Sequence, residues 1–196
     1  MPSRTTLMLL LVLAAAQLTA AGWSIVRYES TLASGTPYRL RVVPVDPADA
    51  FHGRYVAIRP AITLTPPIAP ETEAVLKSFQ QERATGFVVL GADAQGFARA
   101  VDIVSTRPAG GDYLAIDDVR WSNNAANGYT ISLPFDRYYM NEASAPAAQE
   151  RYTAAVGRNA QSTAWLSVRV RNGAGVIDGL FIDGVPIEQV VGGRTR

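Results

Sequence analysis

The sequence predicts a mainly β fold with α+β character: an N-terminal transmembrane helix followed by a mostly antiparallel β domain with two short helices. Three observations support this fold. One long apolar segment lies near the start of the chain. Beyond it, about eight or nine segments have the alternating pattern of strands, and two have a helical pattern. Short turns join most of these strands, which favours antiparallel pairing.

The apolar segment covers residues 7–26 and carries no formal charge. Its length of about twenty residues, at ~1.5 Å per residue, matches a hydrocarbon core of ~30 Å. A cleaved signal peptide is the alternative interpretation, with Arg4 as its basic flank and residues 19–21 as the cleavage site. Retention is favoured, because apolar residues continue past that site and Trp23 stands where an interfacial anchor is expected.

The flanks of this segment also predict the orientation of the chain. A very short tail precedes the segment and a long folded region follows it, so the folded region is expected to be translocated. We therefore interpret residues 1–27 as a membrane anchor, or as a signal peptide, and residues 28–196 as an extracytoplasmic domain. The anchor would contact the lipid bilayer through residues 7–26.

Composition excludes several classes of function. The formal net charge is +1 and there is no run of like charges, so nothing indicates nucleic-acid binding. The absence of cysteine removes disulfides, zinc-thiolate sites, iron–sulfur clusters and thiol catalysis. The chain is long enough to bury one sizeable core.

Two strands are expected early in the domain. Tyr38, Leu40 and Val42 alternate with more polar neighbours, which is typical of a half-buried strand. The next strand, over residues 54–60, is limited by Pro60, which lacks a backbone donor. We expect these two strands to form a connected pair.

Two soluble helices and two hairpins are predicted farther on. One helix covers residues 69–83, and the other follows Ser144 as an N-cap and stops at Gly157. One hairpin covers residues 87–104. The other has strands on both sides of Asn172 and Gly173, a dipeptide typical of a tight hairpin turn.

Catalytic chemistry has few candidates. The lone histidine, His52, lies in a turn-rich loop, and its solvated loop role is favoured over a catalytic one. The only lysine, Lys77, lies within a predicted helix and has no matching serine motif, so an anchored hydrolase is the least favoured interpretation. Neither a metal site nor a nucleotide-binding loop is indicated, so we predict no metal, no cofactor and no enzymatic activity.

The segment DRYYMNE, residues 136–142, is the strongest candidate site. Tyr138 and Tyr139 are adjacent in a strand and must point to opposite faces. Arg137 is placed to pair with a carboxylate near the start of the following helix, such as that of Glu142. A structural corner is favoured over a partner or ligand site, but a ligand-binding surface around Arg137, Tyr139 and Glu142 stays open.

Five segments carry a family resemblance in their order along the chain: VPVDP (43–47), GRYVAIRP (53–60), AQGFARAVDIVSTRP (94–108), RYYMNEA (137–143) and LFIDG (180–184). They resemble the GDYXXLXY family of bacterial membrane-anchored proteins over nearly the whole chain. In the name motif, Arg54 replaces aspartate and Pro60 replaces the final tyrosine. Asn141 and Ala143 replace the family's proline and glycine.

The resemblance selects a set of motif residues whose role it does not specify: Asp46, Pro47, Gly53, Tyr55, Ile58, Arg137, Tyr138, Glu142, Asp183 and Gly184. Since the aspartate of the name motif is replaced, the motif is interpreted as architectural. A second stretch, GDYLAIDD at 111–118, spells the name more closely but lacks a preceding VDP segment. We interpret it as a strand that resembles the motif by chance.

The resemblance also implies a function class. Family members are often encoded beside polytopic membrane proteins, which implies a membrane protein partner. The single apolar segment fits this, and we expect a single-pass location in the bacterial inner (cytoplasmic) membrane. The leading hypothesis is therefore a non-catalytic binding or accessory domain for a membrane partner. The ligand-binding module is the alternative.

Overall fold

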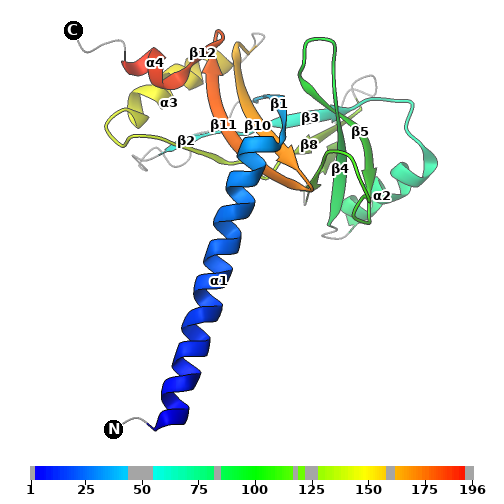
Figure 1. The fold of residues 1–196 in the computed structure, drawn as a ribbon. Helices are drawn as coiled ribbons and strands as arrows, with labels where there is room; N and C mark the ends of the chain where they lie inside the picture. Colours follow the sequence, from blue (N-terminus) through cyan, green and yellow to red (C-terminus); the bar gives the residue numbers. More distant parts are fainter. Residues whose placement is uncertain are drawn as a thin grey trace.

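The architecture is described from a computed structural model, over residues 3–43, 55–81, 85–116, 119–121, 128–157 and 162–192. A long N-terminal helix projects from a β-rich domain (Figure 1). In chain order the elements are α1 (Arg4–Ser34), β1 (Thr36–Arg41), β2 (Tyr55–Ala57), β3 (Ala61–Leu64), α2 (Pro70–Gln81), β4 (Gly86–Ala92), β5 (Ala98–Val104), β6 (Tyr113–Ile116), β7 (Val119–Trp121), β8 (Tyr129–Ser132), β9 (Arg137–Tyr139), α3 (Ala145–Val156), β10 (Ala164–Arg171), β11 (Ala174–Ile182), β12 (Val185–Pro186) and α4 (Ile187–Gly192).

Helix α1 contains the apolar segment and continues beyond it. Its most apolar window has a mean hydropathy of 1.9 and is 0% buried, so the helix is long and apolar enough to cross a membrane. The Ser3 hydroxyl accepts a hydrogen bond from the backbone N–H of Thr6 and caps the start. The polar residues after Val26 extend the helix through Ser34, where the chain turns at Gly35.

The strands of the described residues form four small sheets with antiparallel pairing, as the sequence predicts. Their orders are β1-β10-β11-β12, β2-β9, β3-β8-β7 and β5-β4-β6. Both predicted hairpins are present, β4–β5 and β10–β11. Asn172 (φ 51°) and Gly173 (φ 80°) make the turn of the second hairpin, because such a turn needs two residues with positive φ.

The expected pairing of the first two strands is wrong. Strand β1 pairs with β10 over all six of its residues, from Thr36↔Val170 to Arg41↔Trp165. The segment after β2 reaches the end of β1 at an isolated bridge between Val42 and Pro60, where the Val43 N–H donates to the carbonyl of Arg59 at 2.9 Å. The eight-residue β10 offers a long edge, whereas β2 has three residues and ends before a proline that cannot donate.

Helices α2 and α3 confirm the two predicted soluble helices. Gly157 ends α3 with φ 55°, as expected for a glycine stop. Ser144 stands at the predicted N-cap position, but its backbone is helical (φ −96°, ψ −20°) and its side chain makes no cap hydrogen bond. The Asn141 side chain instead accepts from the backbone N–H of Ala143 at 2.9 Å. Strand β3 and the short helix α4 were not predicted.

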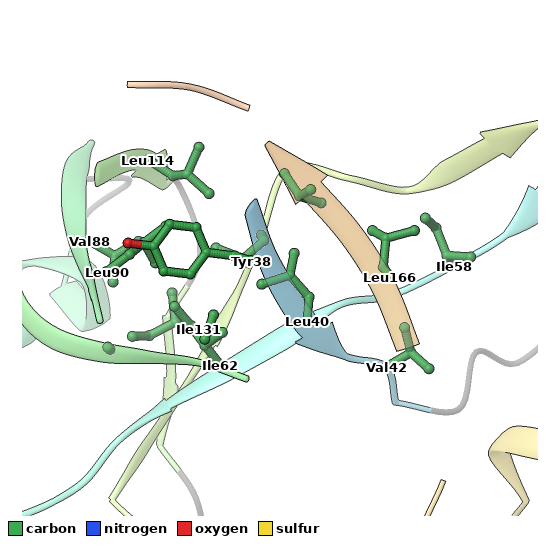
Figure 2. Close-up of a cluster of buried hydrophobic side chains, with 14 of the residues drawn as sticks. Tyr38, Leu40, Val42, Ile58, Ile62, Val88, Leu90, Leu114, Ile131 and Leu166 are labelled. Atoms are coloured by element: carbon green, nitrogen blue, oxygen red, sulfur yellow. The ribbon is translucent and has the colours of Figure 1, made fainter. Parts of the chain in front are cut away.

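One hydrophobic core joins the sheets. Leu40, Val88, Ile131 and Leu166 are each at most 1% exposed, and they come from β1, β4, β8 and β10. Figure 2 shows Tyr38 and Leu40 projecting from β1 into this cluster. Strand β1, which follows α1 directly, is therefore central to the packing of the domain.

Candidate functional site

Strands β2 and β9 bring the name motif and the DRYYMNE segment together. The register pairs Tyr55 with Tyr139, Val56 with Tyr138, and Ala57 with Arg137. Side chains alternate between the two faces of a strand, so this pair has an inner and an outer face. The predicted opposition of Tyr138 and Tyr139 is present, with Tyr138 packed against the core and Tyr139 67% exposed.

The outer face is aromatic and cationic. The rings of Tyr55 and Tyr139 meet edge to face, with centroids 5.9 Å apart and an angle of 67° between the planes. The guanidinium carbon of Arg137 lies 5.0 Å from the centroid of the Tyr55 ring. Its Nε lies 3.5 Å from a carboxylate oxygen of Asp136, the residue directly before β9. We call Tyr55, Arg137 and Tyr139 the motif surface.

The inner face ties the motif to two helices. The Tyr138 hydroxyl donates to Oε1 of Glu188 in α4 at 2.5 Å. Burial first, and then the Glu188 carboxylate, raise the pKa of Tyr138 well above the ordinary tyrosine value. The Gln149 side chain of α3 accepts from the backbone N–H of Ala57 at 2.8 Å. On this face the motif strands therefore contact both α3 and α4.

The remaining motif residues have separate positions. Ile58 is 3% exposed, and its backbone N–H donates to the carbonyl of Asp136 at 3.0 Å. Glu142 is exposed in the turn before α3. Asp183 (φ 53°) and Gly184 (φ 79°) make the two-residue turn between β11 and β12, which is a structural role. Asp46, Pro47 and Gly53 lie outside the described residues, as does His52.

The second stretch, GDYLAIDD, differs from the motif in its surroundings. Its Tyr113 is 4% exposed in β6, whereas Tyr55 is half-buried. The Tyr113 hydroxyl accepts from Nε of Arg107 at 2.6 Å, and its ring meets that of Phe87 edge to face. Tyr113 is therefore a buried packing residue, whereas Tyr55 lies at the edge of an exposed surface.

Catalytic candidates have ordinary surroundings. Lys77 is 64% exposed on α2 and lies 3.4 Å from Glu73, one turn earlier on the same helix. Within the described ranges, no group of three or more His, Cys, Asp or Glu side chains is placed to hold a metal ion.

A cavity that the sequence did not predict lies where α1 meets the β domain. Its volume is about 430 Å³, and its helix side is formed by Trp23, Val26, Arg27, Ser30 and Thr31. These positions are three, four, seven and eight residues from the first, so they share one helix face. This spacing could have indicated from the sequence that the five residues share a helix face. It could not indicate which part of the domain packs against that face. We call this space the junction cavity.

The domain side of the junction cavity comes from two distant segments. Arg107 follows β5, and Arg171 and Asn172 lie at the turn of the β10–β11 hairpin. Nη2 of Arg107 donates to the carbonyl oxygen of Asn172 at 3.0 Å and links the two segments. No local pattern in the sequence could indicate that Arg107 and Arg171 line a common space with Arg27.

The comparisons with known proteins give one match. No match is found among curated proteins or among solved structures. The model of the family described as GDYXXLXY protein matches residues 17–180, which is well over half of the chain and includes β2, β9 and the end of α1. The chain therefore belongs to the GDYXXLXY protein family.

Proposed function

We propose that this protein is a non-catalytic, single-pass membrane protein of the bacterial inner membrane, whose extracytoplasmic β domain binds a polytopic membrane protein partner. One observation carries the proposal: α1 runs without a break from an exposed apolar segment into the packed domain. The domain is thus attached to its apolar helix by a rigid element and not by a linker.

Contacts at the end of α1 support this rigid attachment. Nη1 of Arg171 lies 3.4 Å from the carbonyl oxygen of Ser30 and 2.9 Å from the hydroxyl of Ser34. Thr31 is 2% exposed, and its carbonyl accepts from the backbone N–H of Gly35 at 2.8 Å. The last turn of α1 is therefore part of the domain.

A membrane-spanning α1 would hold the domain close to the bilayer. The helical residues that follow the apolar segment, 27–34, add only ~12 Å at ~1.5 Å per residue. The domain would then lie at the level of the headgroups, within reach of the parts of a membrane protein that protrude there. Leu18 (74% exposed) and Trp23 (72% exposed) leave the sides of the helix open to lipid or to a neighbouring helix.

The motif surface is suited to contact such a partner. Tyr and Arg are enriched among the residues that dominate protein–protein interfaces. Tyr139 is 67% exposed, and the side chain of Arg137 is 49% exposed. The ring of Tyr55 supports both side chains from β2. This preorganised group lies on the outside of the domain, while the same strands are fixed on their inner face.

Site-specific crosslinking in cells tests the proposal. A photoreactive phenylalanine analogue at position 139 is expected to capture one membrane protein, whose identity mass spectrometry establishes. The same analogue at position 151, an exposed residue of α3, is the matched control. Adding Arg137→Ala should reduce the yield at position 139. Recovery of the chain alone from both positions would overturn the partner proposal.

The ligand-binding alternative uses the same surface around Arg137, Tyr139 and Glu142, and the exposure of Tyr139 is the observation in its favour. The side chain of Asp136 beside them is 83% exposed, so the surface is open and not enclosed. A small-molecule site would bury most of its ligand. Titration of the purified chain with polar small molecules, followed by NMR shifts at Tyr139, separates the alternatives: shifts without any crosslinked protein favour a ligand module.

A further inference from the structure

The junction cavity contains positive charge that its surroundings leave uncompensated. Arg27, Arg107 and Arg171 all line it. Within the described part of the chain, none of these three arginines makes an ion pair with Asp or Glu. We propose that the junction cavity binds the phosphate group of an anionic phospholipid headgroup.

Two of the three arginines, Arg107 and Arg171, have neutral hydrogen-bond partners. Arg107 donates from Nε to the Tyr113 hydroxyl and from Nη2 to the carbonyl of Asn172. Arg171 donates from Nη1 to the carbonyl of Ser30 and to the Ser34 hydroxyl. These bonds fix the orientation of two guanidinium groups without neutralising them. A guanidinium has five N–H donors, so each retains donors for a further acceptor.

A phosphate matches this arrangement chemically. Arginine binds phosphate oxygens with paired, charge-assisted hydrogen bonds, and a planar guanidinium that is already held in place loses little entropy on binding. Ser30 and Asn172 add two polar residues to the same lining. The volume of about 430 Å³ exceeds that of a phosphate alone and suits a larger headgroup.

The position of the junction cavity favours a lipid over a soluble phosphate compound. Its helix side runs from Trp23 to Thr31, a rise of ~12 Å along α1. Trp23 and Val26 are 72% and 63% exposed at the end of the apolar segment, whereas Thr31 is buried in the domain. A headgroup in the cavity would therefore leave its acyl chains beside the apolar part of α1. This inference rests on the proposed membrane position of α1 and not on the proposed partner.

Lipid retention by the full chain in nanodiscs tests the inference. The discs contain phosphatidylcholine with or without phosphatidylglycerol, and native mass spectrometry counts the lipids that remain on the released protein. We expect selective retention of phosphatidylglycerol. Arg107→Gln should weaken it about tenfold, the loss of one charged hydrogen bond. Arg151→Gln removes the same charge from exposed α3, away from α1, and should leave retention unchanged.

Two additions keep the test decisive. Arg27→Gln should also reduce the retention of phosphatidylglycerol. The Arg27 side chain makes no hydrogen bond in the described structure, so we expect this variant to fold normally. A further measurement with added inorganic phosphate distinguishes a lipid phosphate from free phosphate as the ligand. We expect that free phosphate does not displace the lipid.

Three results would overturn the inference. The first is equal retention of both lipids, and the second is an equal loss with Arg107→Gln and Arg151→Gln, which would indicate general surface attraction. The third is complete displacement of phosphatidylglycerol by inorganic phosphate. A chain that does not insert into the discs would overturn both this inference and the proposed anchor, whereas a crosslinked partner with no lipid preference would leave the proposed function standing.

Discussion

Nη1 of Arg171 and the hydroxyl oxygen of Ser34 are 2.9 Å apart, and this contact joins the β10–β11 hairpin to the last turn of α1. The two residues are 137 positions apart in the chain. Since Ser34 is followed almost at once by β1, which pairs with β10, the helix and the sheet form one continuous body. In the proposed membrane position of α1, this joint would set both the orientation and the height of the domain above the bilayer.

Two buried tyrosines are expected to respond differently to loss of their hydroxyls. The Tyr38 hydroxyl donates to Oδ2 of Asp112 at 3.1 Å, so Tyr38→Phe should lower the free energy of unfolding by about 1–2 kcal/mol. The buried Tyr152 hydroxyl has no hydrogen bond of standard geometry among the described residues. Burial raises its pKa, and the nearby backbone of Arg59 offsets only part of that rise. Tyr152→Phe should therefore be neutral or stabilise by up to about 1 kcal/mol.

Urea denaturation of the two variants in the same detergent measures the difference. Each variant is the matched control for the other, since each removes one oxygen atom from a core tyrosine. A clear loss of stability in Tyr152→Phe, equal to that in Tyr38→Phe, would show that the Tyr152 hydroxyl has a partner.

Stability is also expected to fall in alkali. Burial, followed by the Asp112 carboxylate, raises the pKa of Tyr38 to about 12, and burial raises the pKa of Tyr152 to about 12, from an ordinary value of 10.0. A raised pKa means that the folded state favours the protonated hydroxyl. This contribution is complete below pH ~10 and is lost as the pH rises toward ~12. Melting temperatures across that range should fall, and less steeply in the double variant Tyr38→Phe, Tyr152→Phe. An unchanged slope would contradict the assignment.

The LFIDG motif is expected to act through backbone conformation. Gly184 has φ 79°, and a Cβ there would meet nothing within 4 Å, so Gly184→Ala should cost about 1–2 kcal/mol from backbone strain alone. Gly110 is a matched control, because it is equally unobstructed and its φ lies outside the positive region. Chemical denaturation of both variants measures the costs. Equal effects, or a loss of crosslinking at position 139 in folded Gly184→Ala, would argue for a different role of this turn.

Local sequence patterns were sufficient for most elements. The apolar run predicts α1, Asn172 and Gly173 predict the β10–β11 hairpin, and Pro70 and Gly157 mark a helix start and a helix end. Each of these signals lies within the element that it specifies or directly beside it. The exception is Ser144, where the chain enters α3 through a turn closed by Asn141, so the serine is already helical.

Long-range relationships could not be read from the sequence. The alternation of Tyr38 and Leu40 indicates a strand but does not name its partner, and the edge of β10 is available only after the C-terminal hairpin forms. The motif surface was partly predicted because Arg137 and Tyr139 are close in sequence, whereas their contact with Tyr55 depends on the β2–β9 register. The junction cavity was not predicted, since its three arginines come from segments that only the fold brings together.

The distance between α1 and the domain tests the central claim most directly. The chain has no cysteine, so Leu18→Cys on α1 and Ala154→Cys on α3, both exposed, allow specific spin labelling. Double electron–electron resonance on the full chain in nanodiscs should give one narrow distance distribution, which Arg171→Ala broadens and Arg151→Ala leaves unchanged. A broad distribution in the otherwise unaltered chain would show that the domain moves freely on its helix and would contradict the account.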